Sequence, residues 1–571
     1  PIECTILGTE PEPWQPWDCL AVYKVRHILM GLLESKVWRA KLLNHLGPEK
    51  TAMLYPGYTP GHLLILPPGA TYQGQGADGL DILTQGVFWV KWLKETLPEE
   101  EEGGSNNWVL AGSRTASGKP LVAGDPHRPL DTPNVYYQNH IACPQFDVVG
   151  LSFAGMPGFP HFGHNKDVAW CVTHTGADYQ DLYVELFKEG ESYLYASQGS
   201  WKQAEVYHET INVRGGEPVK MEVVVTHHGP IVLGGPSVGF GAALKYTATA
   251  QPGRWPEAVF NMLLATSTDE LEEAMRLWVD PVNNFIFADV HGNIGYRTRG
   301  QIPVRHRANA WLPVPGWTGE YEWQGMVPFE EMPHAKNPEE GYIVTANNRV
   351  VGHEYPHYIA LDFSPDFRAR RLVKRIQSLE RATVQDMVSL HADRVSIPAR
   401  RFLELLPKIQ PLNVRCTRAR DKLLEWDGSM EAGRIEPTIF SAFFDNLAKR
   451  VLEPLFGPLF PEAFAGTGRG GPAHFRRLKT LILDMVEKDD RSLLSDGSDW
   501  NTLMAQALAD AVSQLTEKLG ENMETWHWGK LHRTKPQHPL SPTFPQLAKL
   551  LDPPSVAMGG DDHTPQAASY S

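Results

Sequence analysis

The sequence predicts a layered α+β fold, and the order of its local patterns carries that prediction. Apolar residues recur at helical spacing near the N-terminus. Short β-rich runs broken by Gly, Pro, Asn and Asp fill the middle, and helical spacing then returns. Helices, then many strands, then helices favour stacked layers over alternating βαβ units. With 571 residues, the chain exceeds one ordinary core, so we expect two or more packed units.

The first hundred residues are predicted to be mainly helical. Apolar spacing indicates one helix over residues 18–46 and another over residues 80–97, which ends at Pro98. Between them, the apolar run over residues 62–68 is expected to form a short buried strand. The acidic run over residues 99–102 is expected to be a solvated loop.

Strands are predicted from residue 105 onward and helices again beyond about Asp366. Runs such as WVLAG, FDVVGLSF and NFIFADV are typical of strands separated by turns. Runs such as FRARRLVKRIQSL and TIFSAFFDNLAKRVLEPL have the spacing of amphipathic helices. No repeat of fixed period is visible in the sequence.

The composition excludes several classes of function. The chain has 53 Lys and Arg against 67 Asp and Glu, a net charge of −14, and such a surface repels nucleic-acid phosphates. No window approaches the roughly 20 apolar residues that cross a bilayer, so no membrane span is expected. The five cysteines are scattered without a CxxC pair, which argues against a metal–thiolate site.

A serine that could act without a separate base follows two glycines. A hydroxyl is a weak nucleophile unless a base adjoins it. If Ser105 became a chain terminus, its own α-amine, with a pKa of about 7.7–8.0, could accept the proton. Gly104, which lacks a Cβ, would let the Ser105 hydroxyl reach the Gly104 carbonyl for an N→O acyl shift and hydrolysis. No G-x-S-x-G motif offers an alternative serine, because Ala154 replaces the second glycine after Ser152.

Three blocks follow one another within residues 104–185: GSNNWVLAGSRTASGKPLVAGDPH, GLSFAGMPGFPHFGHN and VAWCVTHTGADYQDLYVE. They resemble the penicillin amidase family, whose nucleophile-bearing chain opens with Ser-Asn-x-Trp after a Gly. The blocks PEPWQPWDCLAV, NFIFADVHGNIGY and GQIPVR agree as well. The resemblance therefore covers essentially the whole chain and does not depend on one short motif.

The resemblance implies a four-layer αββα N-terminal-nucleophile hydrolase fold with additional helical segments. It also implies a precursor that cleaves itself into a small chain within residues 1–104 and a large chain over residues 105–571, which stay together as a heterodimer. The implied reaction is hydrolysis of a linear N-acyl amide, such as the side chain of a penicillin, through an acyl-enzyme on Ser105. A periplasmic or secreted location and the absence of an organic cofactor are implied too.

Further catalytic residues follow from the resemblance. The side-chain amide of Asn284 and the backbone N–H of His174 match the donors to the oxyanion. His127 matches the position that touches the terminal amine of the nucleophile, and Arg305 matches an arginine that orders the site. The competing interpretations are a strand-end turn residue for Asn284 and an exposed surface arginine for Arg305.

The acidic segment ADYQD predicts a calcium site. Asp178 and Asp181 can offer oxygens from one bend, with the Gln180 carbonyl between them, and Ca²⁺ prefers such ligands. The resemblance implies a structural calcium that bridges the two chains through a glutamate of the smaller one. Glu34 is the nearest match for that glutamate, and Asp289 is a further candidate ligand. Solvated turn carboxylates are the alternative.

The acyl pocket departs from the family pattern. Phe162 matches an aromatic residue of the pocket, but Arg128 stands where phenylacetyl-selective members carry an aromatic, and Val172 replaces a small polar residue. Aliphatic acyl chains, as in acyl-homoserine lactones, are therefore alternative substrates. An unprocessed, inactive homologue that acts as a binding protein is the alternative from another class.

Overall fold

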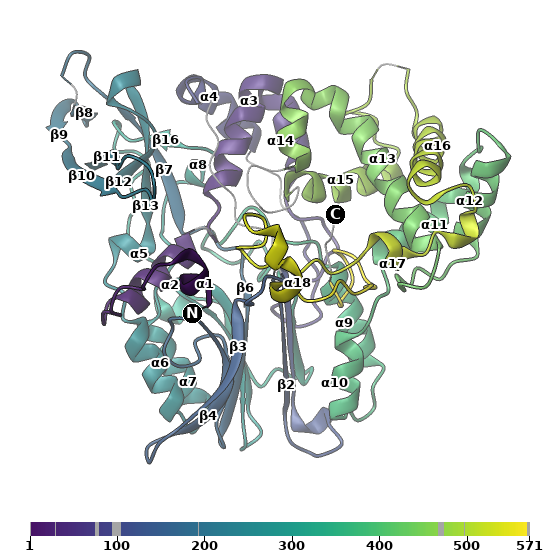
Figure 1. Ribbon diagram of the computed structural model, residues 1–571, viewed down its shortest axis with the longest axis horizontal. Coiled ribbons are helices and arrows are strands. Elements are labelled where there is room, and N and C mark those ends of the chain that lie inside the picture. The colour runs from purple at the N-terminus through teal and green to yellow at the C-terminus, as the bar shows by residue number, and fades with distance from the viewer. Residues whose placement is uncertain are drawn as a thin grey trace.

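Two antiparallel sheets stacked face to face form the centre of the molecule (Figure 1). The computed structural model describes residues 2–28, 30–74, 79–93, 104–128, 130–191, 193–465, 473–495 and 497–567. The three-stranded sheet has the order β18 (Tyr342–Thr345), β1 (Gly104–Leu110), β2 (Leu121–His127). The seven-stranded sheet has the order β17 (His334–Lys336), β15 (Ile294–Arg299), β14 (Asn283–Asp289), β6 (Val168–His174), β5 (Phe162–His164), β4 (Asp147–Phe153), β3 (Tyr136–Ala142).

Helices cover the outer face of each sheet. Strands β1 and β2 pack on β6 and β14, which brings the two sheets together. On the far side of the seven-stranded sheet, α7 (Thr268–Ala274) packs on β14 and β15, and α6 (Trp255–Leu264) packs on α7. Helices α9 (Phe367–Gln377) and α10 (Val384–His391) cover the three-stranded sheet (Figure 1). The layers are therefore α, β, β, α, as predicted.

The alternation of side chains along β1 fixes which face meets the other sheet. The Asn107 side chain accepts a hydrogen bond from Thr345, whose hydroxyl lies 2.7 Å from that of Thr173 on β6. The next residue, Trp108, points the opposite way, and its indole N–H donates to Met387 of α10. Because successive side chains on a strand alternate, Ser105 shares the inward face with Asn107.

A further sheet lies beside this sandwich. Its six strands have the order β10 (Glu205–Ile211), β11 (Val219–Thr226), β12 (Gly229–Gly235), β13 (Phe240–Tyr246), β7 (Gln180–Leu186), β16 (Val314–Pro315). A hairpin of β8 (Leu194–Ser197) and β9 (Ser200–Gln203) adjoins it. Strand β7 follows β6 after a short bend, so this bend joins the sheet to the sandwich.

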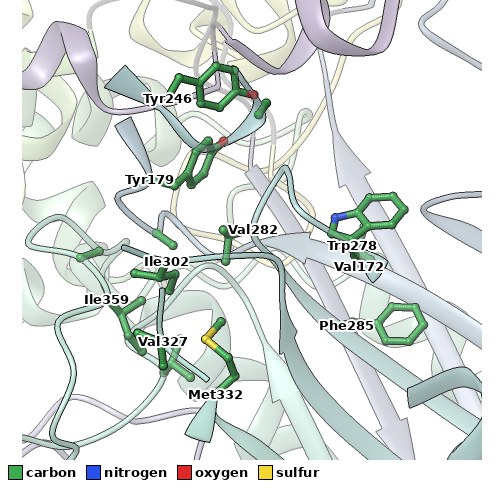
Figure 2. Close-up of a cluster of buried hydrophobic side chains, with 14 of the residues drawn as sticks. Val172, Tyr179, Tyr246, Trp278, Val282, Phe285, Ile302, Val327, Met332 and Ile359 are labelled. Carbon is green, nitrogen blue, oxygen red and sulfur yellow. The ribbon is translucent and has the colours of Figure 1, made fainter. Parts of the chain in front are cut away.

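The segment before residue 104 is embedded in the rest of the chain. The largest apolar cluster includes Tyr23 and Val37 together with Val172, Trp278 and Phe285 of the sandwich side. Figure 2 shows part of this cluster. A second cluster joins α3 (Leu33–Leu54) to the C-terminal helices. Those helices are α11 (Ile397–Leu405), α12 (Val414–Leu424), α13 (Glu436–Phe456), α14 (Phe460–Ala465), α15 (Ala473–Lys488), α16 (Trp500–Leu519) and α17 (Trp528–Leu531), and α18 (Ala548–Leu551) follows them along the chain.

The helical predictions are confirmed with changed boundaries. The single helix expected over residues 18–46 is two, α2 (Asp18–Ile28) and α3, and α3 is kinked at Gly47, whose φ of 77° is left-handed. Helix α4 (Gly79–Val90) matches the second expected helix, and α9 begins at Phe367. The acidic run over residues 99–102 lies outside the described residues. Within the described part of the chain, no helix is long and apolar enough to cross a membrane.

The prediction of a strand over residues 62–68 is wrong. That run makes only an isolated bridge between Leu63 and Thr71. The backbone N–H groups of Ile65 and Leu66 donate to carbonyls of the loop at residues 349–350, and two prolines then follow without an N–H. The run is buried as expected, but its backbone is satisfied by a loop and not by a sheet.

A substitution at Trp38 tests how much the packing of α3 on the C-terminal helices stabilises the protein. Its side chain is fully buried, stacked on His474 with ring centroids 4.3 Å apart. We expect Trp38→Ala to lower the free energy of unfolding by about 3–5 kcal/mol, measured by urea unfolding with circular dichroism. Trp201→Ala, at a tryptophan that is 46% exposed, is the control and should cost less than about 1 kcal/mol. An equal decrease in the free energy of unfolding in the two variants would contradict this packing.

Candidate active site

Ser105 is the second residue of β1 and is buried at the inner face of the sandwich. Its Cα pairs with Pro126 of β2, and that of Gly104 pairs with His127. The inward direction of its side chain brings Oγ to the end of β6, where the backbone N–H of His174 donates to it at 3.3 Å. The structure therefore places two residues predicted to act together, Ser105 and His174, in direct contact.

Asn347 is a second polar contact of Ser105 that the sequence analysis missed. Its Nδ2 donates to Ser105 Oγ at 3.1 Å and to the His174 carbonyl at 2.8 Å. Its Oδ1 accepts the backbone N–H of Ser105 at 2.9 Å. Asn347 lies just after β18 with a φ of 64°, a conformation that asparagine adopts more readily than most residues. Two asparagines directly after a buried strand were the signal available in the sequence.

Arg368, in the first turn of α9, holds the same backbone from the other side and was also missed. Its guanidinium donates to the Ser105 carbonyl and to Asn106 Oδ1, both at 2.8 Å, and to Asn347 Oδ1 at 2.9 Å. The side chain is buried, and burial lowers the pKa of Arg368 to about 10. A fixed positive charge thus adjoins the backbone nitrogen of Ser105.

The imidazole nitrogen Nδ1 of His127 lies beside Gly104. Its Nε2 lies 3.0 Å from Asp125 Oδ2. Burial raises the pKa of Asp125, but hydrogen bonds from His127 and His391 hold it well below its ordinary value. An ionised carboxylate only accepts, so Nε2 carries the hydrogen and Nδ1 the lone pair. A Cβ on Gly104 would lie 2.8 Å from that Nδ1, which explains the glycine.

Asn284 is buried in β14 opposite Thr173 of β6. Its Oδ1 accepts from the Tyr296 hydroxyl at 2.7 Å. Its Nδ2 donates to Thr173 Oγ1 at 2.9 Å and to the His174 carbonyl at 3.4 Å. Asn284 is therefore part of a strand interior and not a turn, and it adjoins Ser105 through the backbone of His174.

Arg305 lies in a buried charge cluster and not on the surface. Its Nε lies 2.7 Å from Asp181 Oδ2 and its Nη2 lies 2.9 Å from Asp178 Oδ2. Both carboxylates are fully buried, which excludes the solvated-turn interpretation. Burial alone would raise the pKa of Asp181, but the charges of Arg305 and Lys36 lower it. Arg305 thus orders the bend between β6 and β7 that carries these carboxylates.

The expected calcium ligands come together only in part. Asp178 and Asp181 do converge with the Gln180 carbonyl, but on the ammonium of Lys36. Glu34 is instead hydrogen-bonded to His474 at 2.6 Å. The Asp289 carboxylate accepts from Thr268 and Asn293 around the β14–β15 turn. Ca²⁺ takes six to eight oxygen ligands, and the point where these three oxygens meet is filled by Lys36, so this arrangement does not fit the ion.

The residues predicted to line the acyl pocket lie on two different faces of the seven-stranded sheet. A Cβ on Gly124 of β2 would lie 2.9 Å from both Phe162 Cδ1 and Cys171 Cβ, so these two side chains face β2. Val172 points to the opposite face of β6, where it lies near Phe285 (Figure 2). Cys171, one residue before the predicted Val172, therefore shares a face with Phe162, and Val172 does not.

Positive charge gathers beyond Phe162. The ring of Tyr136 packs edge-on against Phe162, with centroids 5.5 Å apart, and its hydroxyl lies 2.9 Å from His161 Nδ1. Burial raises the pKa of Tyr136, and Arg128 and Arg26 lower it through charge and hydrogen bonding. Burial and the same two arginines, together with Arg299, hold the pKa of His161 well below its ordinary value. The predicted Arg128 thus lies close enough to Tyr136 and His161, the neighbours of Phe162, to act on both through its charge.

The fold and the site together define a class of protein. A serine at the start of a central strand in an αββα sandwich, with polar groups gathered around its backbone nitrogen and an N–H on its hydroxyl, is the arrangement of an N-terminal-nucleophile amide hydrolase.

Comparisons with known proteins agree. The penicillin amidase family model matches residues 1–571. The chain is 36% identical to the penicillin acylase 2 proenzyme of Pseudomonas sp. (strain SE83), covering 99% of this chain and 72% of the relative. It is 27% identical to the acyl-homoserine lactone acylase QuiP of Pseudomonas aeruginosa, covering 100% and 72%. The chain belongs to the penicillin amidase family and is an amide hydrolase that acts on N-acyl amides.

A solved structure supports the fold. The thermostable penicillin G acylase from Alcaligenes faecalis, in orthorhombic form, matches with a TM-score of 0.63 at 24% identity. The match covers 74% of this chain and 80% of that chain. The αββα architecture described above is therefore shared with a known acylase.

Asn347→Ala tests the residue that the sequence analysis missed. The change removes a donor to Ser105 Oγ and the acceptor of its backbone nitrogen, so we expect kcat to fall roughly 100- to 1,000-fold. Steady-state hydrolysis of an acyl p-nitroanilide measures this, with fragment content checked by gel. Asn212→Ala, on an exposed loop, is the control. An Asn347→Ala enzyme with the wild-type kcat would show that these contacts play no part in the reaction.

Proposed function

We propose that Ser105, released by cleavage of the Gly104–Ser105 bond, is the nucleophile of this acylase. The observation that supports this most is the convergence on one residue of His174 N–H, Asn347 and Arg368, which hold its hydroxyl, its nitrogen and its carbonyl. Any buried residue needs partners for its backbone N–H and C=O, so within this set the two N–H donors on the Ser105 hydroxyl, from His174 and Asn347, support the proposal most. The same three groups would hold the residue after cleavage.

The release of Ser105 would begin with attack of its Oγ on the Gly104 carbonyl carbon. The C–N bond breaks, the new ester forms, and the Oγ proton passes to the nitrogen with His127 Nδ1 as carrier. Water then hydrolyses the ester, which leaves the Gly104 carboxylate and restores the Ser105 hydroxyl. The lone pair of His127 beside Gly104 supports this assignment.

The freed amine would then act as the base. Asn347 Oδ1 would hold it, and the nearby Arg368 charge would disfavour its protonated form, which favours the neutral amine that a base requires. The amine takes the Oγ proton as Ser105 attacks the substrate carbonyl, and the His174 N–H and the Asn284 amide stabilise the oxyanion. The proton passes to the leaving amine, and water releases the acid from the acyl-enzyme. The two segments would remain a heterodimer because they share two apolar clusters.

The charge of the pocket supports an acyl group that ends in a carboxylate. Arg26 and Arg128 act together on Tyr136, whose ring packs against Phe162. A carboxylate placed there would gain charge-assisted hydrogen bonds. An aliphatic tail would displace water from the guanidinium groups and offer no hydrogen bond in its place, which is costly. We therefore propose a dicarboxylic acid monoamide in preference to a phenylacetyl or long aliphatic amide. The periplasmic or secreted location stays a prediction from the resemblance.

His127→Ala tests the carrier in the cleavage step. Loss of the lone pair beside Gly104 should slow conversion of the precursor to two fragments about 100-fold, followed by gel after expression in a cell-free system. Burial lowers the pKa of His127 below its ordinary 6.5. Conversion of the wild type should therefore be constant above pH 6.5 and fall in more acid solution, where Nδ1 is protonated.

His140→Ala is the matched control, because His140 also pairs with an aspartate but is exposed on β3. Conversion of His127→Ala at the wild-type rate would remove His127 from the cleavage step.

An amide panel tests the substrate class. Glutaryl, phenylacetyl and hexanoyl p-nitroanilides share one leaving group, and we expect the glutaryl compound to have a kcat/KM roughly 10- to 100-fold above the others. Arg128→Leu should abolish that preference. A faster hexanoyl amide, together with turnover of N-hexanoyl homoserine lactone, would favour the lactone-signal alternative. Cleaved protein that hydrolyses none of the amides would favour the binding-protein alternative.

A further inference from the structure

Four fully buried charges meet where the N-terminal segment touches the bend between β6 and β7. The Lys36 ammonium, from the first turn of α3, donates to Asp178 Oδ1 at 2.9 Å and to Asp181 Oδ1 at 2.6 Å. Its third hydrogen bond goes to the Gln180 carbonyl at 2.5 Å. Arg305 pairs with the other oxygen of each aspartate. None of the four side chains is more than 1% exposed.

The charge of this cluster is balanced without a metal. Two aspartates offset one lysine and one arginine, so the net charge is zero. A buried charge without compensation is costly, and a divalent cation added to this set would leave two positive charges in excess. The same three oxygens that the sequence analysis assigned to Ca²⁺ are the ones that bind the ammonium.

The neighbouring backbone ties the same two segments together. The Gln180 side chain donates to the Ile28 carbonyl at 2.8 Å. It passes so close to Gly31 that a Cβ there would lie 1.5 Å from Gln180 Oε1. The contact between α3 and the β6–β7 bend thus depends on a glycine, an amide and an ammonium, all supplied by the protein.

We propose that the Lys36 ammonium replaces a divalent cation as the link between the N-terminal segment and the β6–β7 bend, and that this enzyme needs no calcium. The link holds whether or not the chain is cut at residue 104, so it does not rest on the proposed catalytic role of Ser105. It predicts that removing the ammonium exposes three oxygens that a cation can then bind.

Metal content and melting temperature of the purified protein test this proposal. The purified protein is dialysed first against about 1 mM CaCl₂, a concentration that saturates tight Ca²⁺ sites, and then against metal-free buffer. Wild-type protein should then carry no stoichiometric calcium, as measured by mass spectrometry of metals. Its melting temperature should be the same with EDTA and with excess Ca²⁺. Lys36→Ser should melt about 5 °C or more below wild type, and Ca²⁺ should restore part of that loss.

Lys41→Ser is the matched control, since Lys41 lies further along α3 and also pairs with a carboxylate, that of Glu462, but is partly exposed. It should melt close to wild type and not respond to Ca²⁺. About one tightly bound calcium per wild-type chain, or a drop in wild-type melting temperature with EDTA, would overturn the proposal even if Lys36→Ser fails to fold. A Lys36→Ser protein as stable as wild type, with no response to Ca²⁺, would overturn it too.

Discussion

The hydrogen bonds between the Asn347 side chain and Ser105 join the three parts on which the chemistry depends. Asn347 reaches the hydroxyl and the nitrogen of Ser105 at once and also holds the carbonyl of His174. The three-stranded sheet, the seven-stranded sheet and the loop after β18 therefore meet at one residue. Because Asn347 itself is fixed by Arg368 of α9, the outer helical layer contributes to the position of Ser105.

Buried charge is used in two different ways within this fold. At Ser105, the guanidinium of Arg368 donates to neutral acceptors, and the carboxylates that act on its charge, Asp125 and Asp562, are not among its hydrogen-bond partners there. At the β6–β7 bend, Lys36 and Arg305 are neutralised by Asp178 and Asp181, and the cluster connects segments. In the proposed mechanism the first arrangement tunes the amine of Ser105, and the second connects the N-terminal segment to the sheets.

The sequence predicted the layers and the contact between Ser105 and His174, because these depend on local periodicity and on residues in ordered blocks. It did not predict Asn347 or Arg368, since both are brought to Ser105 by strand pairing and helix packing across more than 200 residues of chain. Val172 was chosen over Cys171 because strand alternation decides the face of each side chain, and an error of one residue reverses it. The role of Lys36 was not predicted, because no sequence motif indicates that a lysine ammonium will lie between two carboxylates.

The central claim is that Ser105 works only once its own nitrogen is a free amine. N-terminal sequencing of the larger fragment, taken from protein that hydrolyses an acyl amide, tests this directly. We predict that the fragment begins Ser-Asn-Asn-Trp, at Ser105. Protein that hydrolyses the amide with the Gly104–Ser105 bond intact would contradict the account.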